Sequence, residues 1–264
     1  VTTGANIDLA QAGNLFLATT IATGNLNIWT GGNLSQPWWR VSVEGTTTVT
    51  AAGNVSLNTS NNIFNGSVSI LSGNNVSIVD STPLDMGAST ISGNLTLQSN
   101  GALTQSGALD VEGITSITAG AANNITLNNA SNDFTGAVSV VSGNNVTLTD
   151  ANSLILGASN FSGNLSVTAL AGNLSTSGGL TKNSGADAVA SLKATGNIVL
   201  EDDITSTLNQ LDLTLWSDSD NDANGSISMM GVNNTDLVIT TNGGDILMGG
   251  VRMPQRTMRL EVDM

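Results

Sequence analysis

The chain has 264 residues, of which Gly, Asn, Ser and Thr make up 125, and it contains no His, Cys or Tyr. Without His or Cys it can form no Ser-His-Asp triad, thiol nucleophile, Cys/His zinc site or disulfide. The formal net charge of −14 argues against nucleic acid as a partner, and the lack of any stretch of 18 apolar residues argues against membrane insertion.

From the N-terminus onward, the phrase Gly-Asn followed by apolar-polar-apolar residues recurs and predicts short, half-buried strands. It occurs at residues 13–17, 24–28, 53–57, 93–97, 163–167 and 196–200, and with a second Asn at 73–78 and 143–148. The step between neighbouring phrases is often 20 residues, as from Gly53 to Gly73 and Gly93. Two or three strands in about 20 residues are too few for an independent sheet, but they fit one coil of a β-solenoid that pairs with the coils on either side.

The residue types agree with such coils. Val, Ile, Leu and Phe are expected to point inward, and Ser and Thr outward. Gly and Asn are expected at the corners, where they accept positive φ, and stacked Asn side chains can form hydrogen bonds between coils.

An aromatic pair interrupts this pattern early in the chain. Trp38 and Trp39 follow Pro37 and precede Arg40, in a chain with four Trp. Exposed aromatic rings stack on sugar rings, and Arg40 could bind a carboxylate or sulfate, so these three residues are a candidate glycan site. The alternative is an inserted loop that packs over the solenoid or forms a subunit contact.

A longer period of about 70 residues overlies the coils. The segment 64–76 returns as 134–146, and Asp80 returns as Asp150. We therefore predict a single solenoid domain over residues 1–264, with a divergent C-terminal segment. The repeat copies are predicted at about 24–92, 93–162 and 163–231, each with three or four coil steps, and the divergent segment at 232–264.

Residues 186–194 could form a short helix, but the Gly-Asn phrase resumes directly afterwards, so we predict a strand with an insertion. Paired carboxylates suggest a polysaccharide-degrading β-helix as the less favoured alternative. Glu201 and Asp203 would share a face if they lay in a strand, whereas Asp80 and Asp150 occupy equivalent repeat positions, which suggests a role in turns. Because basic residues are scarce, we predict no enzymatic activity.

Acidic residues are concentrated near the C-terminus. Starting at Asp220, the sequence resembles the opening of an EF-hand loop, with oxygen ligands from Asp220, Asp222 and Asn224, and Asp218 lies just before them. The match ends at Gly231, which stands where that loop needs a bidentate Glu. These four residues are a candidate calcium site, and a solvated acidic loop is the alternative.

The run 251–264 departs from the repeat, with three Arg and one Pro, and could cap the last coil or join a neighbouring subunit. The phrases at 163–167 and 143–148, with Leu213–Asp220 and Thr241–Gly250, resemble bacterial large exoproteins of the filamentous-haemagglutinin type. That resemblance implies a secreted, right-handed parallel β-helix that serves as an adhesin, surface fibre or stalk. The Asn-Pro-Asn motif of the family's secretion domain is absent, so the resemblance implies a piece of the shaft.

The predicted fold is thus all-β, a right-handed parallel β-helix (β-solenoid) with about 20 residues per coil and a superimposed 70-residue repeat. The expected function is a structural or adhesive shaft at the bacterial cell surface. Its partners would be glycans or proteins of host or neighbouring cells. The alternative is a fibre of copies joined end to end, which would be a heterologous, non-closing assembly.

Overall fold

The computed structural model describes residues 1–231 and 236–250, and all regular structure in them is β-strand. Two compact units are present: unit 1 comprises residues 1–119 and 131–136, and unit 2 comprises residues 120–130 and 137–264. Among the described residues, no helix is long and apolar enough to cross a membrane. The all-β prediction is confirmed.

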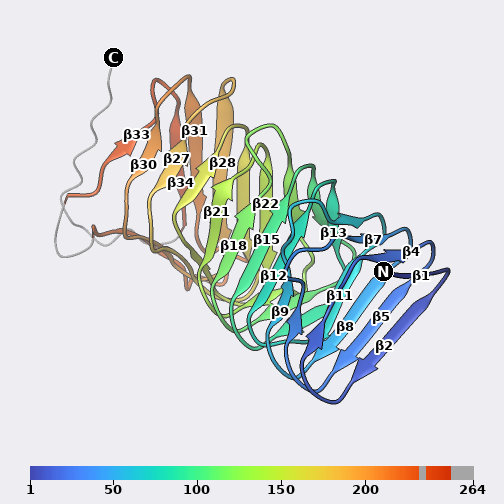
Figure 1. The fold of residues 1–264 in the computed structure, drawn as a ribbon. Helices are drawn as coiled ribbons and strands as arrows, with labels where there is room; N and C mark the ends of the chain where they lie inside the picture. Colours follow the sequence, from blue (N-terminus) through green and yellow to red (C-terminus); the bar gives the residue numbers. More distant parts are fainter. Residues whose placement is uncertain (232–235, 251–264) are drawn as a thin grey trace. The chain divides into compact units, whose positions relative to one another are not determined.

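Unit 1 is a stack of coils whose strands form four parallel sheets (Figure 1). Sheet I consists of β2 (Ile7–Gln11), β5 (Leu26–Thr30), β8 (Thr47–Ala51), β11 (Val68–Ser72), β13 (Leu84–Met86) and β16 (Leu103–Gln105). Sheet II consists of β3 (Leu15–Phe16), β6 (Leu34–Ser35), β9 (Val55–Leu57), β12 (Val76–Asp80), β15 (Leu95–Ser99) and β18 (Thr115–Thr118). Sheet III holds β1 (Thr2–Gly4), β4 (Thr20–Ala22), β7 (Val41–Val43) and β10 (Ile63–Phe64), and sheet IV holds β14 (Ser89–Ile91), β17 (Leu109–Val111) and β20 (Asp133–Phe134).

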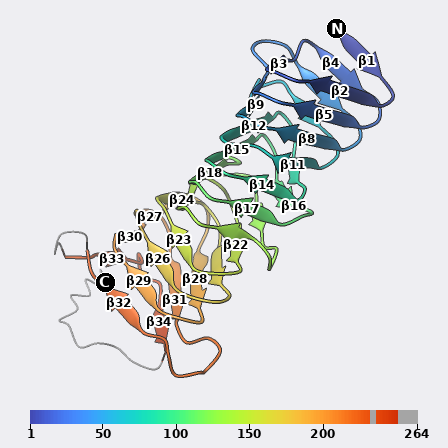
Figure 2. The same ribbon diagram turned by 90° about the horizontal axis from the view of Figure 1, so that it is seen from below.

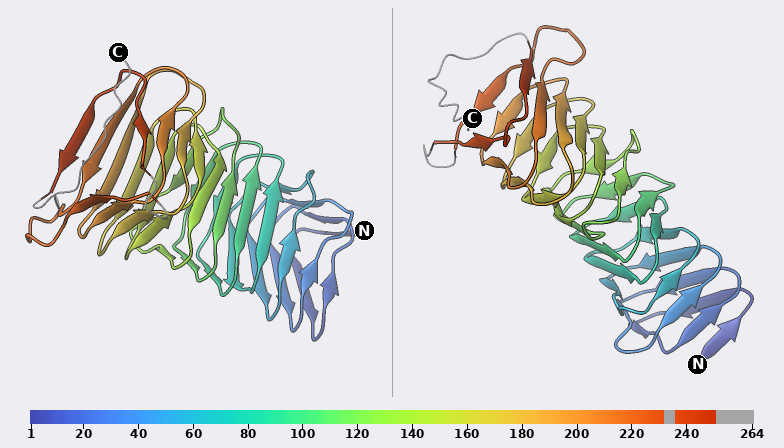
Figure 3. Two further views of the ribbon diagram at one scale, coloured as in Figure 1. Left: turned by 90° about the vertical axis from the view of Figure 1, so that its left-hand side faces the viewer. Right: turned by 90° about the horizontal axis from the view of Figure 1, so that it is seen from above.

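Unit 2 has the same construction with three parallel sheets (Figures 2 and 3). Sheet V consists of β19 (Ile125–Leu127), β22 (Val146–Asp150), β25 (Leu165–Ala169), β28 (Ala188–Ala194), β31 (Leu211–Trp216) and β34 (Ile246–Gly249). Sheet VI consists of β21 (Val138–Ser142), β23 (Leu154–Leu156), β26 (Leu174–Thr176), β29 (Ile198–Leu200) and β32 (Ile227–Met229). Sheet VII consists of β24 (Ser159–Phe161), β27 (Leu180–Lys182), β30 (Ile204–Ser206) and β33 (Ile239–Thr240).

The pairing registers confirm a β-solenoid of short coils, close in length to the step predicted from the sequence. Along sheet II, Leu15 pairs with Leu34, Leu34 with Val55 and Val55 with Val76. The corner asparagines just before these strands are separated in the same way, by 19 and then 21 positions along the chain. Each strand therefore pairs with the strand one coil earlier and one coil later, and long-range parallel pairing replaces the local hairpins of an antiparallel protein.

The core of each coil comes from strict alternation along the strands. In β8, Thr47, Val49 and Ala51 are buried while Thr48 and Thr50 are only half-buried. Each fully buried Val, Leu, Ile or Phe side chain contributes about 1.5–3 kcal/mol. Three Phe residues are among the largest fully buried side chains, Phe64, Phe134 and Phe161. Burial of these stacked side chains stabilises the coils.

Asparagine side chains at the corners form the predicted ladder between coils. The Oδ1 atom of Asn14 accepts the N–H of Asn33 at 2.9 Å, and Asn33 Oδ1 accepts the N–H of Asn54 at 2.8 Å. The ladder continues from Asn54 through Asn75 to Asn94. Each Asn thus satisfies a backbone donor that the turn would otherwise leave to water.

The glycines of the Gly-Asn phrases have a different role from the one predicted. Among the described residues, these glycines have no positive φ, apart from Gly172 in the related phrase of the third copy. Instead, a Cβ on Gly32 would lie 2.8 Å from the backbone nitrogen of Asn14 and closer still to its Oδ1. A Cβ on Gly196 would lie 2.5 Å from Asn173 Oδ1 in the same way. In most of the Gly-Asn phrases, Gly is therefore needed because an asparagine of the previous coil lies directly over it, not because of φ, whereas Gly73 and Gly143 face Val and Ile side chains.

The 70-residue repeat does not equal a whole number of coils. Leu26 begins β5 in sheet I, whereas its counterpart Leu95 begins β15 in sheet II. Conversely, Leu34 begins β6 in sheet II, whereas its counterpart Leu103 begins β16 in sheet I. With about 20 residues per coil, about 70 residues make roughly three and a half coils, so successive copies are half a coil turn apart.

The segment that could have been a helix is a strand, as predicted: β28 spans Ala188–Ala194. The predicted C-terminal cap at 251–264 lies outside the described residues.

Candidate functional site

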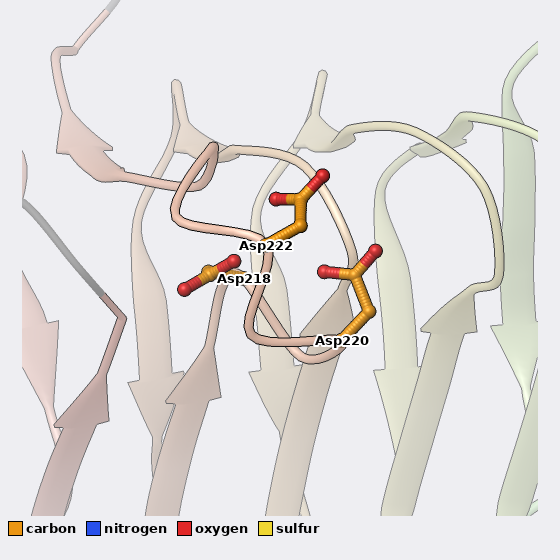
Figure 4. Close-up of side chains that lie close together, drawn as sticks. All are labelled: Asp218, Asp220 and Asp222. Atoms are coloured by element: carbon orange, nitrogen blue, oxygen red, sulfur yellow. The ribbon is translucent and has the colours of Figure 1, made fainter.

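The acidic candidate site is a loop of unit 2 between β31 and β32. Carboxylate oxygens of Asp218, Asp220 and Asp222 lie within 4.8 Å of one another (Figure 4). Asp218 is 2% exposed, while Asp220 and Asp222 are exposed. The structure thus brings the three predicted carboxylates together, and the fourth predicted residue, Asn224, lies within hydrogen-bond distance of Asp222.

Hydrogen bonds within the loop position two of these carboxylates. Asp218 Oδ1 accepts the N–H of Ala223 at 3.0 Å, and Asp218 has a φ of 53°. Asp222 accepts bonds from the backbone N–H of Asn224 at 2.9 Å and from its Nδ2 at 3.0 Å. The side-chain bond from Asn224 is the main cause that lowers the pKa of Asp222 below its ordinary value. Asn224 therefore holds the carboxylate of Asp222 through its Nδ2.

Oxygen-rich chemistry of this kind suits a hard divalent cation. Ca²⁺ binds six to eight oxygens at about 2.3–2.6 Å, so carboxylate oxygens within 4.8 Å of one another can share one ion. Gly225 packs directly against Asp218. A Cβ at position 225 would lie 2.6 Å from the Cβ of Asp218, so this close approach requires glycine. The loop lies between strands, so it is not an EF-hand.

The aromatic candidate site is the loop between β6 and β7 in unit 1. Trp38 is 82% exposed and Trp39 is 56% exposed, and Arg40 is also exposed. Trp38 therefore faces solvent, and more than half of the surface of Trp39 is exposed as well. Phe16, which is 68% exposed, pairs in register with Ser35 just before the loop, so exposed aromatic surface spans two neighbouring coils.

A buried amide pair holds the base of this loop. Asn62 Nδ2 donates to Gln36 Oε1 at 2.9 Å, and Asn62 Oδ1 accepts bonds from Gln36 Nε2 and from the N–H of Val41. Gln36 Nε2 also donates to the carbonyl of Trp39. Both amide side chains are at most 2% exposed, so the loop backbone is fixed while its three large side chains face solvent.

The same amide pair recurs in the next copy. Asn132 Nδ2 donates to Gln105 Oε1 at 3.0 Å, and Asn132 Oδ1 accepts the N–H of Leu109 at 2.9 Å. There the pair closes over residues 106–108, Ser-Gly-Ala, instead of Pro-Trp-Trp-Arg. The fold therefore does not need the aromatic residues to form this corner.

Sequence reasoning missed the amide pair. Gln36 and Asn62 are 26 residues apart, and no local motif marks either residue. The available signal was their return one repeat copy later as Gln105 and Asn132.

Two of the carboxylates considered for catalysis, Asp80 and Asp150, end strands β12 and β22 and bind the turns that follow. Asp80 is 1% exposed and accepts bonds from the N–H and Oγ1 of Thr82 and from the N–H of Phe64. Burial raises the pKa of Asp80, and these hydrogen bonds partly oppose that shift. Asp150 is also buried and accepts the N–H of Asn152 at 2.6 Å. Both residues therefore support turns, as their equivalent positions suggested.

Glu201, Asp202 and Asp203 form the turn between β29 and β30, so strand alternation does not place Glu201 and Asp203 on one face. Asp203 Oδ1 accepts the N–H of Val238 at 2.8 Å, and Asp202 Oδ1 accepts the N–H of Asp203 at 2.8 Å. Two of these three carboxylates thus bind backbone donors of their own unit.

Comparison with known proteins gives one family. The family described as Repeats of unknown function (DUF5649) matches three times, at residues 4–71, 73–141 and 143–228. These matches confirm the long repeat period, although each begins about one coil before the corresponding copy predicted from the sequence. No curated protein and no solved structure matches the chain significantly.

Proposed function

The chain belongs to the family of repeats described as DUF5649, and we propose that it is a non-enzymatic structural and adhesive β-solenoid shaft of a secreted bacterial surface exoprotein. The observation that carries this proposal is the pair of matched corner loops in unit 1. One amide pair closes over Ser-Gly-Ala, and the other holds Trp38, Trp39 and Arg40 in solvent. Because the corner forms without Trp38, Trp39 and Arg40, these side chains are not required for folding and can serve in binding.

The chemistry of the loop points to acidic glycans. Indole rings stack on the apolar faces of sugar rings, and a guanidinium forms paired hydrogen bonds with a carboxylate or sulfate. Arg40 is the one basic residue in the sequence of unit 1. An anionic group that binds to this unit would therefore pair with Arg40. We therefore propose glycans of host or neighbouring cells, bearing carboxylate or sulfate groups, as partners.

A loop exchange tests this function. Replacing residues 37–40 with the Ser-Gly-Ala of residues 106–108 should reduce binding to immobilised sulfated or uronic glycans at least about tenfold, which is about 1.4 kcal/mol. The melting temperature should not change, because the second copy already closes on that sequence. Arg40→Lys is the matched control, since it keeps the charge but loses the planar fork. Equal glycan binding by the exchange variant would contradict the proposal.

We also propose that the acidic loop of unit 2 binds Ca²⁺ and thereby stabilises that unit. The cluster of Asp218, Asp220 and Asp222 supports this proposal. A dissociation constant of about 1 mM, as in extracellular calcium modules, would stabilise the fold by about 1.4 kcal/mol at about 10 mM Ca²⁺. Asp220→Asn should abolish the calcium-dependent rise in melting temperature, with Mg²⁺ as the ion control. An identical rise in the variant would assign it to non-specific binding.

The proposed absence of enzymatic activity is tested separately. Incubation with neutral and acidic polysaccharides should release no new reducing ends and create no unsaturated products. Release of either, reduced by Asp203→Asn, would support the polysaccharide-degrading alternative instead.

A further inference from the structure

One tryptophan of unit 2 lies outside both candidate sites. Trp216, at the end of β31, is 45% exposed, and the Nζ atom of Lys193 lies over its indole ring, 4.8 Å from the ring centroid. The strands that carry these two residues, β31 and β28, are neighbours in sheet V (Figure 2). In the described part of the chain, the Lys193 ammonium donates no hydrogen bond and forms no ion pair, so its three donors are free for a ligand.

The fold does not need this pair of side chains. Lys193 lies three residues before the phrase at 196–200, and Thr50 holds the same position before the phrase at 53–57 in the first copy. The register partner of Lys193 on the next coil is Trp216, and that of Thr50 is Ser72. A threonine and a serine thus form the same part of the outer face in unit 1. The tryptophan and the lysine are therefore available for binding.

A glycine leaves space beside the indole. Gly249 of β34 is the register partner of Trp216 on the following coil. Its φ is not positive, and a Cβ there would meet no described atom within 4 Å other than Cδ1 of Trp216, at 3.9 Å. Neither backbone conformation nor close packing therefore requires glycine at this position. Glycine weakens a strand, and it often marks a place where a ligand approaches the backbone closely.

The side chains around the indole suit the hydroxyl groups of a sugar. Half-buried hydroxyl side chains occupy the nearest outward positions of β25, β28 and β31, namely Thr168, Ser191 and Thr214. These hydroxyls and the Lys193 ammonium can bond the hydroxyl groups of a sugar while its apolar face stacks on the indole.

The local charge favours a neutral sugar over an acidic one. Directly after Trp216 the chain enters the acidic loop with its three aspartates, and in the other direction the outward row of β31 continues to the exposed Asp212. Lys193 is the one basic residue in the described strands of sheet V. A carboxylate or sulfate at the indole would be repelled from both sides, whereas a neutral sugar carries no charge for the aspartates to repel.

From these observations we propose that the outer face of sheet V around Trp216 binds neutral pyranose sugars. The sugar ring stacks on the indole beside Gly249, and Lys193 donates to its hydroxyl oxygens. This site is separate from the aromatic loop of unit 1 and takes a different class of sugar. Its test is therefore independent of the function proposed for that loop.

The indole N–H signals in the NMR spectrum of the isotope-labelled chain report on each tryptophan separately. The Trp216 signal is assigned with Trp216→Ser, because serine holds the equivalent position in the first copy. Neutral trisaccharides of glucose, mannose and galactose are the probes, and we expect at least one of them to shift this signal saturably. The corresponding trisaccharide of glucuronic acid should bind at least about tenfold more weakly.

Trp29 is the internal control. It is 51% exposed, which is close to the value for Trp216, but its register partners are Ala10 and Thr50, neither of which is basic. Its signal should therefore not respond to the neutral sugars. A saturable shift of Trp29 with the same affinity would overturn the proposal, because exposure alone would then account for binding.

Two substitutions make the test specific. Lys193→Thr, which introduces the residue of the first copy, should weaken binding at least about tenfold. Gly249→Val should not lower the melting temperature, because its Cβ makes only an ordinary contact and valine favours strands, but it should abolish the shift by filling the space beside the indole.

Three further outcomes would overturn the proposal. The first is a Trp216 signal that responds to none of the neutral sugars. The second is equal affinity for the glucuronic acid trisaccharide. The third is undiminished affinity in a folded Lys193→Thr or Gly249→Val chain. Responses of Trp38 and Trp39 to acidic glycans bear only on the aromatic loop, so either site can fail alone.

Discussion

Unit 1 and unit 2 are built from one repeat, but they differ in how strictly they keep the coil length. Along sheet V of unit 2, Leu165 pairs with Ala190 and Leu213 with Ile246. The residues that precede these partners are joined by hydrogen bonds: Asn164 Oδ1 accepts the N–H of Val189, 25 positions later, and Asp212 Oδ1 accepts the N–H of Asp245, 33 positions later. In unit 1 the nearly constant steps let one asparagine ladder continue from Asn14 to Asn94. The longer coils of unit 2 keep corner bonds, as from Asn173 to Asn197, and their extra residues form additional loops, such as the acidic loop.

The largest expected effect concerns the neutral buried amides that hold unit 1. Asn62→Ala leaves the N–H of Val41, the carbonyl of Leu57 and the Oε1 atom of Gln36 without partners, at about 3 kcal/mol in the free energy of unfolding. Asn54→Ala, on the exposed ladder, should cost about 1 kcal/mol because water replaces its bonds. Urea unfolding of both variants measures the difference. Equal losses would mean that burial of the amide pair does not set its contribution.

The next effect tests whether close stacking of the coils is specific to the asparagine ladder. Gly53→Ala in unit 1 should destabilise by about 2 kcal/mol, because Asn33 must move and release the N–H of Asn54. Gly179→Ala in unit 2 meets only ordinary contacts, the nearest at 3.5 Å, so its effect should be below about 0.5 kcal/mol. Thermal unfolding of the pair decides the matter, and a comparable loss in both would remove the ladder as the cause.

The smallest expected effect is a difference in how the stability of each unit depends on pH. Burial raises the pKa of Asp80 in unit 1, so the native state holds more protons than the unfolded state just above pH 3.8, and stability falls as the pH rises through that range. Burial lowers the pKa of Lys182 in unit 2, so the native state holds fewer protons just below pH 10.5, and stability rises with pH there.

Single substitutions should remove the acid-side and the alkaline-side dependence of stability on pH independently. Asp80→Asn should remove the acid-side dependence and Lys182→Met the alkaline one, as measured by urea midpoints across the pH range. Lys182 donates to the carbonyls of Ser184 and Leu208, so its variant should also lose some stability at every pH. Unchanged slopes in both variants would mean that other groups set the pH dependence.

The sequence was sufficient for the coil, because apolar alternation and a nearly constant step appear directly in the chain. It was not sufficient for the reason behind Gly32 or Gly53, because residue type suggested positive φ, whereas the cause is an asparagine of the preceding coil. That cause is visible only once the register between coils is known.

The candidate sites divide in the same way. Asp218, Asp220 and Asp222 are close in sequence, so their convergence could be anticipated. The amide pair Gln36 and Asn62 could not be, since its members belong to different coils and resemble ordinary corner residues. Local composition therefore revealed the candidate ligands in the loops, but not the hydrogen bonds between coils that fix the loop backbone.

The half-turn between successive 70-residue copies has a consequence for how such proteins change over generations. Gaining or losing one copy by recombination would move every downstream loop to the opposite side of the solenoid, while gaining or losing two would return it to the original side. A change by an even number of copies therefore alters only the length of the solenoid. In odd steps it also alters which side of the molecule meets a neighbour.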